Sequence, residues 1–204
     1  MSDLQSIHED LAFMKALADD DGRMPPAIGG QFVAAGLIYG LPVFPAWAVL
    51  RGLLPWPQGW VSWIGFGSTL VFVPLLIVMM SRARSRGWSP GPSGRAFGAL
   101  WTSVALTLLT LGAATVVAGQ RLNSPELWQL WPSILFGVYG SAWAGVALVR
   151  RSLSWGLVAF GSYATAVVSA LLIGSTPDVL LCTAIGLQLW LTLPGVALMR
   201  HARA

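Results

Sequence analysis

The sequence predicts an all-α membrane protein: a polytopic bundle of six transmembrane helices, with both termini in the cytoplasm and a cytoplasmic amphipathic helix before the first span. Composition is the first observation, because 55% of the 204 residues are hydrophobic and only 10% are charged, whereas soluble proteins carry about 25% charged residues. The second is that the apolar residues form runs long enough to cross a bilayer. The third is that the basic residues gather in alternate gaps between those runs.

Six apolar runs are predicted to cross the membrane. Each has about the 20 residues that a helix needs to span about 30 Å of hydrocarbon, and the gaps between them are too short for a soluble domain. We therefore expect a cytoplasmic helix and linker, 1–30, and a six-helix domain, 31–204. The predicted spans are 31–54, 59–80, 96–119, 132–149, 155–174 and 178–199.

Basic residues predict the orientation, because Lys and Arg are enriched in cytoplasmic loops. With a cytoplasmic N-terminus, only Arg51 and Arg121 of the 12 Lys and Arg residues fall on the outer side. The even number of spans returns the C-terminus to the cytoplasm. The inner side then carries Lys15, Arg23, Arg82, Arg84, Arg86, Arg95, Arg150, Arg151, Arg200 and Arg203.

Tryptophans lie close to the predicted span ends, which is typical of aromatic belts at the membrane surface. This interpretation is preferred to a ligand-binding cage. The outer belt would contain Trp56, Trp60, Trp63, Trp128 and Trp131, and the inner belt Trp88, Trp101 and Trp155.

Small residues recur at intervals of four in two spans, where they would let helix backbones approach closely. Gly36 and Gly40 form one such pair in the first span, and Gly137, Ser141 and Gly145 form a stripe in the fourth. We expect these faces to pack within the bundle. The alternative is a homodimer seam.

Prolines are predicted to kink or interrupt three spans, because each lacks a backbone N–H. They are Pro42 and Pro45 in the first span, Pro74 in the second and Pro194 in the last. Helix packing around a bend is one interpretation, and a hinge or discontinuous helix of the transporter kind is the other. The second interpretation has some support from a partial likeness, over a handful of positions, between "IYG…VLRG" and "VYG…LVRR", 100 residues apart and in opposite membrane orientation. Inverted three-plus-three repeats of this kind are a feature of transporters.

The residues that most catalytic chemistry requires are missing from the predicted spans. Asp, Glu, Lys, Arg and His are absent from the predicted spans, apart from Arg51 and Asp178 at their outer edges. The sequence contains a single cysteine, Cys182. Intramembrane charges normally mark proton relays and ion pathways. The sequence has no P-loop, dinucleotide fingerprint or HExxH motif. We therefore expect no enzymatic activity, no cofactor and no metal site.

Hydroxyl and amide side chains supply the remaining polarity of the spans. At spacings of three and four residues, each set lies on one face of its helix. Hydrogen bonding between helices is the preferred interpretation, and a weakly polar cavity for a neutral or amphiphilic molecule is the alternative. The three sets are Ser103, Thr107 and Thr110; Ser162, Thr165 and Ser169; and Gln188 and Thr192.

The N-terminal segment is predicted to be an amphipathic helix with a narrow apolar seam, formed by Leu4, Ile7, Leu11 and Met14. In residues 1–23, two basic residues minus six acidic ones give a net charge of −4, which opposes binding to an anionic leaflet. A protein surface is therefore the expected partner. It is either the chain's own basic inner face or a separate cytoplasmic protein. The inner-face residues are Arg82, Arg84, Arg86, Arg150 and Arg151.

The opening "DLAFMKALADDDGR", followed by a Pro-containing linker, "GG" and a first span, resembles a group of uncharacterised small bacterial inner-membrane proteins. These proteins begin with a similar acidic amphipathic helix and have six spans. The likeness covers about 20 residues plus the topology. It implies residence in a bacterial inner membrane and a transcriptional regulator of the winged-helix kind as a partner, and it implies no catalytic residues.

Taken together, these features predict a non-enzymatic sensor, anchor or regulatory partner that contacts membrane lipid and a cytoplasmic protein. Direct binding to nucleic acid is not expected, because the positive charge follows the membrane topology and forms no stripe. The alternative is a small transporter or export component for a neutral or lipophilic molecule.

Overall fold

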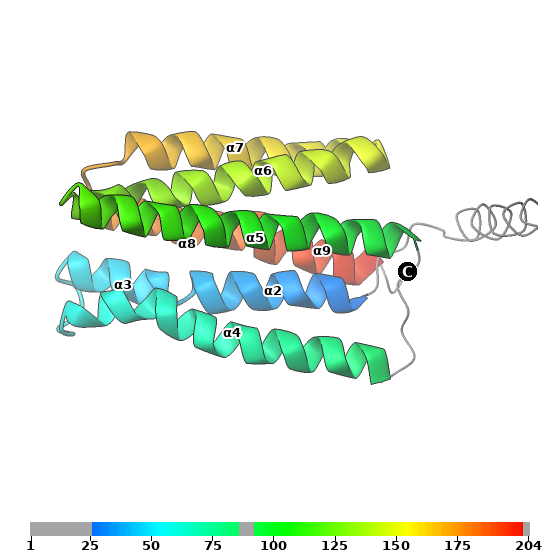
Figure 1. Ribbon diagram of the computed structural model, residues 1–204, viewed down its shortest axis with the longest axis horizontal. Helices are drawn as coiled ribbons and strands as arrows, with labels where there is room; N and C mark the ends of the chain where they lie inside the picture. The colour runs from blue at the N-terminus through cyan, green and yellow to red at the C-terminus, as the bar shows by residue number, and fades with distance from the viewer. Residues whose placement is uncertain (1–25, 86–91, 202–204) are drawn as a thin grey trace, which may run out of the picture.

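The computed structural model of the chain describes residues 26–85 and 92–201, and every regular element in these two ranges is helical (Figure 1). The long helices run side by side along one direction. The elements are α2 (Pro26–Gly40), α3 (Val43–Leu50), α4 (Gly59–Ser85), α5 (Pro92–Arg121), the 3-10 turn η1 (Pro125–Leu130), α6 (Trp131–Arg150), α7 (Leu153–Leu171), α8 (Thr176–Leu187), the π-helical turn η2 (Gln188–Thr192) and α9 (Leu193–His201).

Six helical segments are long and apolar enough to cross a membrane, which confirms the predicted number. The first combines α2 with α3, and the last combines α8, η2 and α9. Their ends agree with the sequence prediction to within three residues at all but two positions. The first span ends at Leu50 and not at 54, because Gly52 turns the chain with a φ of +72°. The fourth span begins at Glu126 and not at 132, because the turn η1 precedes α6 without a gap. The segments are Ile28–Leu50, Gly59–Arg82, Gly94–Arg121, Glu126–Arg150, Leu153–Leu171 and Thr176–Arg200.

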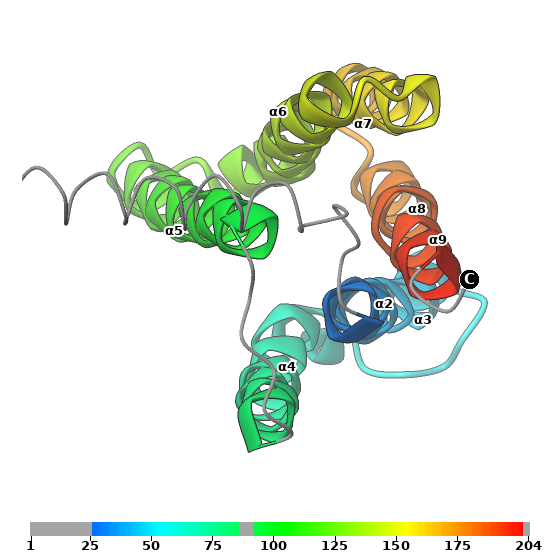
Figure 2. The same cartoon turned by 90° about the vertical axis from the view of Figure 1, so that its right-hand side faces the viewer.

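Seen end-on, the helices follow one another around an arc (Figure 2). The two broken spans lie together in the middle of this arc, with α2 packed on α9 and α3 packed on α8. Helix α6 packs on α7, whereas α4 contacts chiefly α2, and α5 contacts chiefly α6 and η1. The outlying position of α4 and α5 leaves most of their surfaces exposed. Only 6% and 11% of their most apolar stretches are buried, against 22% to 39% in the other four spans.

An aromatic cluster fills the space between α2, α5, α6 and α7. Trp143 is fully buried, stacks on Trp155 at 5.1 Å and meets the edge of Trp101 at 5.1 Å between ring centroids. Phe32 joins them from α2, 4.5 Å from the ring of Trp101. The expectation that Trp101 and Trp155 anchor the inner membrane surface is therefore wrong for both, because their rings serve to pack four helices together.

The five tryptophans predicted for the outer belt lie outside this aromatic cluster, and four of them are exposed. Trp56, Trp60, Trp63 and Trp128 are exposed, whereas the half-buried Trp131 packs its ring over Gly112. Trp88 lies outside the described residues.

Glycines allow α2 and α9 to touch backbone to backbone. A Cβ atom on Gly195 would lie 2.8 Å from the Gly29 carbonyl oxygen and 2.8 Å from the Val33 nitrogen. On Gly36, a Cβ would overlap the Thr192 hydroxyl and lie 2.9 Å from the Thr192 nitrogen. A Cβ on Gly40 would overlap the amide nitrogen of Gln188 in the same way. The predicted close contact of the Gly36 and Gly40 face is thus a contact with the last span.

The small-residue stripe of the fourth span does not make the expected close contact. A Cβ on Gly137 or Gly145 would meet nothing within 4 Å among the described residues. Ser141 donates to the Gly137 carbonyl and accepts a hydrogen bond from the Tyr163 hydroxyl. Close packing on α6 occurs instead at Gly140, where a Cβ would lie 2.8 Å from the Tyr163 ring of α7. Of the predicted stripe, only Ser141 contacts the same ring, through its hydroxyl.

Substitution by alanine should have opposite effects on stability at a glycine in close helix contact and at a glycine that faces open space. Gly36→Ala inserts a Cβ into the Thr192 backbone, so we expect the free energy of unfolding to fall by about 1–3 kcal/mol. Gly137→Ala, on the open side of α6, should raise it by up to about 1 kcal/mol, since alanine is the better helix former. Unfolding of the detergent-solubilised protein, followed by tryptophan fluorescence, measures both. Equal destabilisation of the two variants would contradict the conclusion that Gly36 lies in a close helix contact and Gly137 does not.

Candidate functional site

The first span is interrupted where α2 ends at Gly40 and α3 begins at Val43. Pro42 has no N–H to donate to the Ile38 carbonyl, four residues earlier. That carbonyl accepts a hydrogen bond from the Ser68 hydroxyl of α4, at 2.9 Å. A side chain of a neighbouring helix therefore satisfies the acceptor that the proline leaves open, as the hydrocarbon interior requires.

The last span is interrupted in the same manner. Between α8 and α9, the Leu193 N–H donates to the Gln188 carbonyl, five residues back, and this forms the π-helical turn. Pro194 cannot donate to the Trp190 carbonyl, which accepts a hydrogen bond from the Trp143 indole of α6, at 3.0 Å. Single π-helical turns within α-helices are frequent at functional sites.

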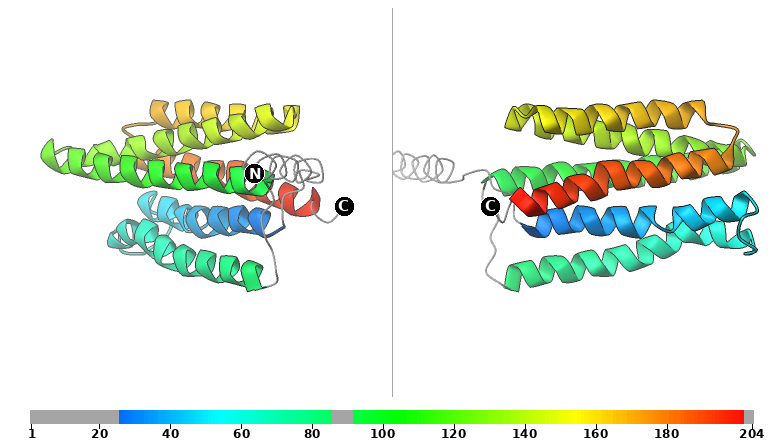
Figure 3. Two further views of the ribbon diagram at one scale, coloured as in Figure 1. Left: turned by 45° about the vertical axis from the view of Figure 1, so that its right-hand side comes forward. Right: turned by 180° about the vertical axis from the view of Figure 1, so that it is seen from behind.

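The two interruptions lie close together, because η2 packs on α2. The rear view in Figure 3 shows the two spans, α2–α3 and α8–α9, side by side. The Gln188 amide nitrogen donates to the Gly36 carbonyl at 3.0 Å. The Thr192 hydroxyl donates to the Gln188 amide oxygen at 2.9 Å. The missing side chain at Gly40 leaves room for the amide. Gln188 and Thr192 therefore act in hydrogen bonding between helices, and they fill the space between the two breaks.

A charged contact joins the far ends of the same two spans. Arg51, which follows α3, forms an ion pair with Asp178 in the first turn of α8. The Ser175 hydroxyl donates to the other Asp178 oxygen at 2.5 Å. The start of α8 is held in addition by the buried Gln129, whose amide donates to the Thr176 hydroxyl at 3.2 Å and accepts from the Gly174 N–H at 2.7 Å.

The hydroxyl set of α7 lies in the contact with the last span. Thr165 accepts a hydrogen bond from the Trp190 indole at 2.7 Å, and the Ser169 hydroxyl is 3.3 Å from the Cys182 sulfur. Ser162 is fully buried and donates to the Val158 carbonyl of its own helix. These contacts favour the packing interpretation for this set.

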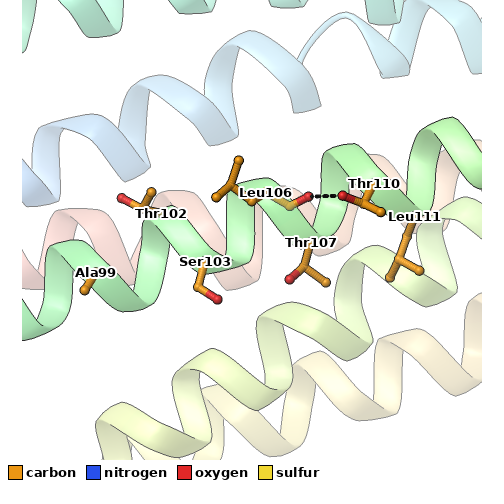
Figure 4. Close-up of a pocket in the computed structure, with 7 residues that line it drawn as sticks. All are labelled: Ala99, Thr102, Ser103, Leu106, Thr107, Thr110 and Leu111. Carbon is orange, nitrogen blue, oxygen red and sulfur yellow. Dashed lines mark hydrogen bonds between the residues drawn. The ribbon is translucent and has the colours of Figure 1, made fainter.

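The hydroxyl set of α5 has a different environment, an open groove of about 630 Å³ on the exposed side of the helix (Figure 4). Ser103 and Thr107 lie on the side nearer α6. Thr110 donates to the Leu106 carbonyl at 2.9 Å, whereas Ser103 and Thr107 have no hydrogen-bond partner among the described residues. The groove is lined by Ala99, Thr102, Ser103, Leu106, Thr107, Thr110 and Leu111.

The expected docking surfaces are described only in part. Arg82, at the end of α4, and Arg150 and Arg151, at the turn between α6 and α7, lie at the same end of the bundle (Figure 1). The side chain of Arg84 and the whole of Arg86 lie outside the described residues, as do Leu4, Ile7, Leu11 and Met14.

Searches of protein-family models, curated proteins and solved structures found no match to this chain. Among residues 26–85 and 92–201, no group of three or more His, Cys, Asp and Glu side chains is placed to hold a metal ion. The polar groups at the breaks are an amide and hydroxyls, which can bind through hydrogen bonds but do not titrate near neutral pH.

Sequence reasoning missed two residues that hold the breaks together, Ser68 and Trp143. A usable signal exists for the carbonyls, because each lies four residues before a proline. No signal in the sequence identifies which neighbouring side chain donates to them, since the donors lie 30 and 47 residues away along the chain.

Removal of the Gln188 amide should weaken the contact between the first and last spans. We expect Gln188→Leu to lower the free energy of unfolding by about 0.6–1.7 kcal/mol, the range measured for hydrogen bonds between membrane helices. Thr192→Val should add less in the Gln188→Leu background than alone, because both residues belong to one network. SDS titration in mixed micelles provides the measurement. As a control, Thr110→Val removes an exposed hydroxyl that bonds only to its own helix, and a loss as large as that of Gln188→Leu would refute this role.

Proposed function

We propose that this chain is a multi-pass protein of a bacterial inner membrane that lacks enzymatic activity and acts as a sensor, anchor or regulatory partner. Both termini lie in the cytoplasm, and the acidic helix within residues 1–23 is exposed there to a protein partner. The observation that carries the proposal is the separation of charge between the two ends of the bundle.

One end of the bundle is strongly basic. It contains the start of α2, the end of α4, the start of α5, the turn between α6 and α7, and the end of α9 (Figure 1). At the opposite end, Arg121 ends α5, and the charge of Arg51 is balanced by Asp178. Basic residues mark the cytoplasmic side, which supports this orientation. The described basic residues of the first end are Arg82, Arg95, Arg150, Arg151 and Arg200.

The acidic N-terminal segment is the part of the chain that bilayer residence does not explain. Its net charge of −4 disfavours the anionic lipid surface, and its apolar seam calls for burial in a groove of a partner. A transcriptional regulator is the partner that the family resemblance implies. The basic end of the same bundle is the competing partner.

A pull-down from solubilised membranes tests recruitment. We expect the full chain to retain a cytoplasmic protein that is lost on deletion of residues 1–23 and on the paired change Leu11→Glu and Met14→Glu, which places charge in the apolar seam. The paired change Ser6→Glu and Ala16→Glu adds the same charge away from the seam and should retain the partner.

Crosslinking separates recruitment from self-docking. In a Cys182→Ser background, a cysteine at position 14 is paired with one at Ser85, an exposed residue at the end of α4. Efficient intramolecular crosslinking would show that the helix occupies the chain's own basic end, and the recruitment proposal would be abandoned.

A second function, transport of a neutral or lipophilic molecule, is favoured by the groove on α5. The groove exposes the hydroxyls of Ser103 and Thr107 beside the exposed Leu106, whereas the exposed side of α4 carries large aromatic side chains such as Trp63 and Phe66. Large apolar side chains suit contact with lipid. Unpaired hydroxyls in the same environment have an energetic cost, which a weakly polar ligand or a second copy of the chain would offset.

Proteoliposomes distinguish this alternative from the regulatory function. If the chain transports, flux of a neutral lipophilic dye should fall at least severalfold in the Ser103→Ala and Thr107→Val double variant. Ser81→Ala, which removes an exposed hydroxyl bonded only within α4, should leave flux unchanged. Dye flux no greater than that of empty liposomes would refute transport of this class of molecule.

A further inference from the structure

We propose that α3 is a hinged gate: a half-helix that swings about the break at Leu41 and Pro42 and is latched against α8 by the Arg51–Asp178 ion pair. The proposal is independent of what the protein binds. It rests on four features of the described residues: a weak backbone connection at one end of α3, an exposed loop at the other end, a fixed surface opposite, and one charged contact across the gap.

The hinge is the break itself. Neither Pro42 nor Pro45 has an N–H, so two hydrogen bonds of the regular ladder are absent at the start of α3. The Phe44 N–H donates to the Leu41 carbonyl, three residues back, at 3.2 Å. Because the Ile38 carbonyl is already satisfied by Ser68, α2 does not need α3 to complete its own hydrogen bonds. The Leu41 N–H still donates to the Leu37 carbonyl at 3.0 Å, so rotation beyond this N–H leaves the carbonyls of Leu37 and Ile38 paired.

The far end of α3 is also free to move. After Leu50, the chain continues through Gly52 with a φ of +72° into a stretch, 51–60, that is exposed at all positions but Leu54. No regular helix begins again until Gly59. An 8-residue half-helix is thus joined to the bundle by a proline break on one side and by a surface loop on the other.

The surface opposite α3 is fixed. Helix α8 has Val179 and Ala184 fully buried. Gln129 of η1 holds its start through one hydrogen bond to Thr176, the first residue of α8, and one from the Gly174 N–H just before it. Its other end is held by the Gln188 contact with Gly36. Helix α3 packs more extensively against α8 than against any other element, with Ala46 and Val49 buried. Any relative motion is therefore a motion of α3.

The latch is the ion pair between Arg51 and Asp178. Both side chains are partly open to solvent, with relative exposures of 46% and 35%. Exposed ion pairs contribute little to stability, so this one can break without loss of the fold. The latched position also leaves a polar group unsatisfied, because the Trp47 indole nitrogen is buried there without a hydrogen-bond partner among the described residues, which has an energetic cost. Release of the latch would let this group reach a partner at the membrane surface.

Distance measurements between spin labels test the gate in the full chain, reconstituted in liposomes with Cys182 replaced by serine. One label is placed at Leu53, beyond α3, and one at Leu171, at the end of α7; both residues are exposed. An 8-residue helix is about 12 Å long, so a swing of about 25° moves its end by about 5 Å. We expect a narrow distribution for the latched chain and a shift or broadening by about 5 Å in Arg51→Gln and in Asp178→Asn.

Two further variants define the mechanism. The charge reversal Arg51→Asp with Asp178→Arg should restore the narrow distribution. Pro42→Ala, which allows a continuous first span, should suppress the shift caused by Arg51→Gln. A reference pair at Leu122, in the turn after α5, and Leu171, at the end of α7, lies outside the gate and should keep its distance in every variant.

The outcomes distinguish an ion pair that latches a mobile half-helix from one that supports the bundle as a whole. An unchanged distance between positions 53 and 171 in both latch variants would overturn the proposal, because the ion pair would then hold nothing in place. A matching shift in the reference pair would also overturn it, since the ion pair would then be a general support of the bundle and not the latch of one half-helix.

Discussion

The architecture depends on one constraint: within the hydrocarbon, every backbone carbonyl and N–H must find a partner in the protein. The two interrupted spans meet this constraint with help from other helices, because Pro42 and Pro194 each remove a donor. The open carbonyls of Ile38 and Trp190 are satisfied from outside their own helices, by Ser68 of α4 and by Trp143 of α6. Each break therefore determines which continuous helix lies beside it.

Close approach of the two broken spans follows from the same constraint. The Gln188 amide reaches the Gly36 carbonyl because neither Gly36 nor Gly40 has a side chain in the way. A larger residue at either position would separate the backbones and leave the amide without its acceptor. An unpaired amide at this depth is costly, so the glycines and the glutamine depend on each other. The breaks, the glycines and the amide form one unit.

The sequence predicts the helical architecture well because length and hydropathy alone decide whether a helix can cross a bilayer. It predicts helix neighbours poorly, because bilayer residence makes most faces of a span apolar. The stripe of Gly137, Ser141 and Gly145 has the right spacing for close packing, yet the contact of α6 falls at Gly140.

The same difficulty explains the other differences from prediction. Trp101 and Trp155 are of the residue type and at the positions expected of surface anchors, but their rings pack on Trp143 in the hydrophobic core. The likeness between the first and fourth spans does not extend to structure either, because α6 is continuous where the first span breaks after Gly40. Pro74 likewise lies within the continuous helix α4. Proline signals a missing donor, and the neighbouring helices decide whether the helix is interrupted there.

The two outlying helices show how the exposed surface and the breaks are connected. Helix α4 supplies Ser68 to the first break, and its exposed side chains are those that lipid accepts. Helix α5 presents hydroxyls outward and turns Trp101 inward, where the ring contacts Trp143 at 5.1 Å. Since the Trp143 indole donates to the Trp190 carbonyl, two side chains separate the α5 helix from the break in the last span. Displacement of α5 by a bound molecule or another helix would therefore shift Trp143. Among the described residues, the Trp143 indole is the donor that satisfies the Trp190 carbonyl in place of the N–H that Pro194 lacks.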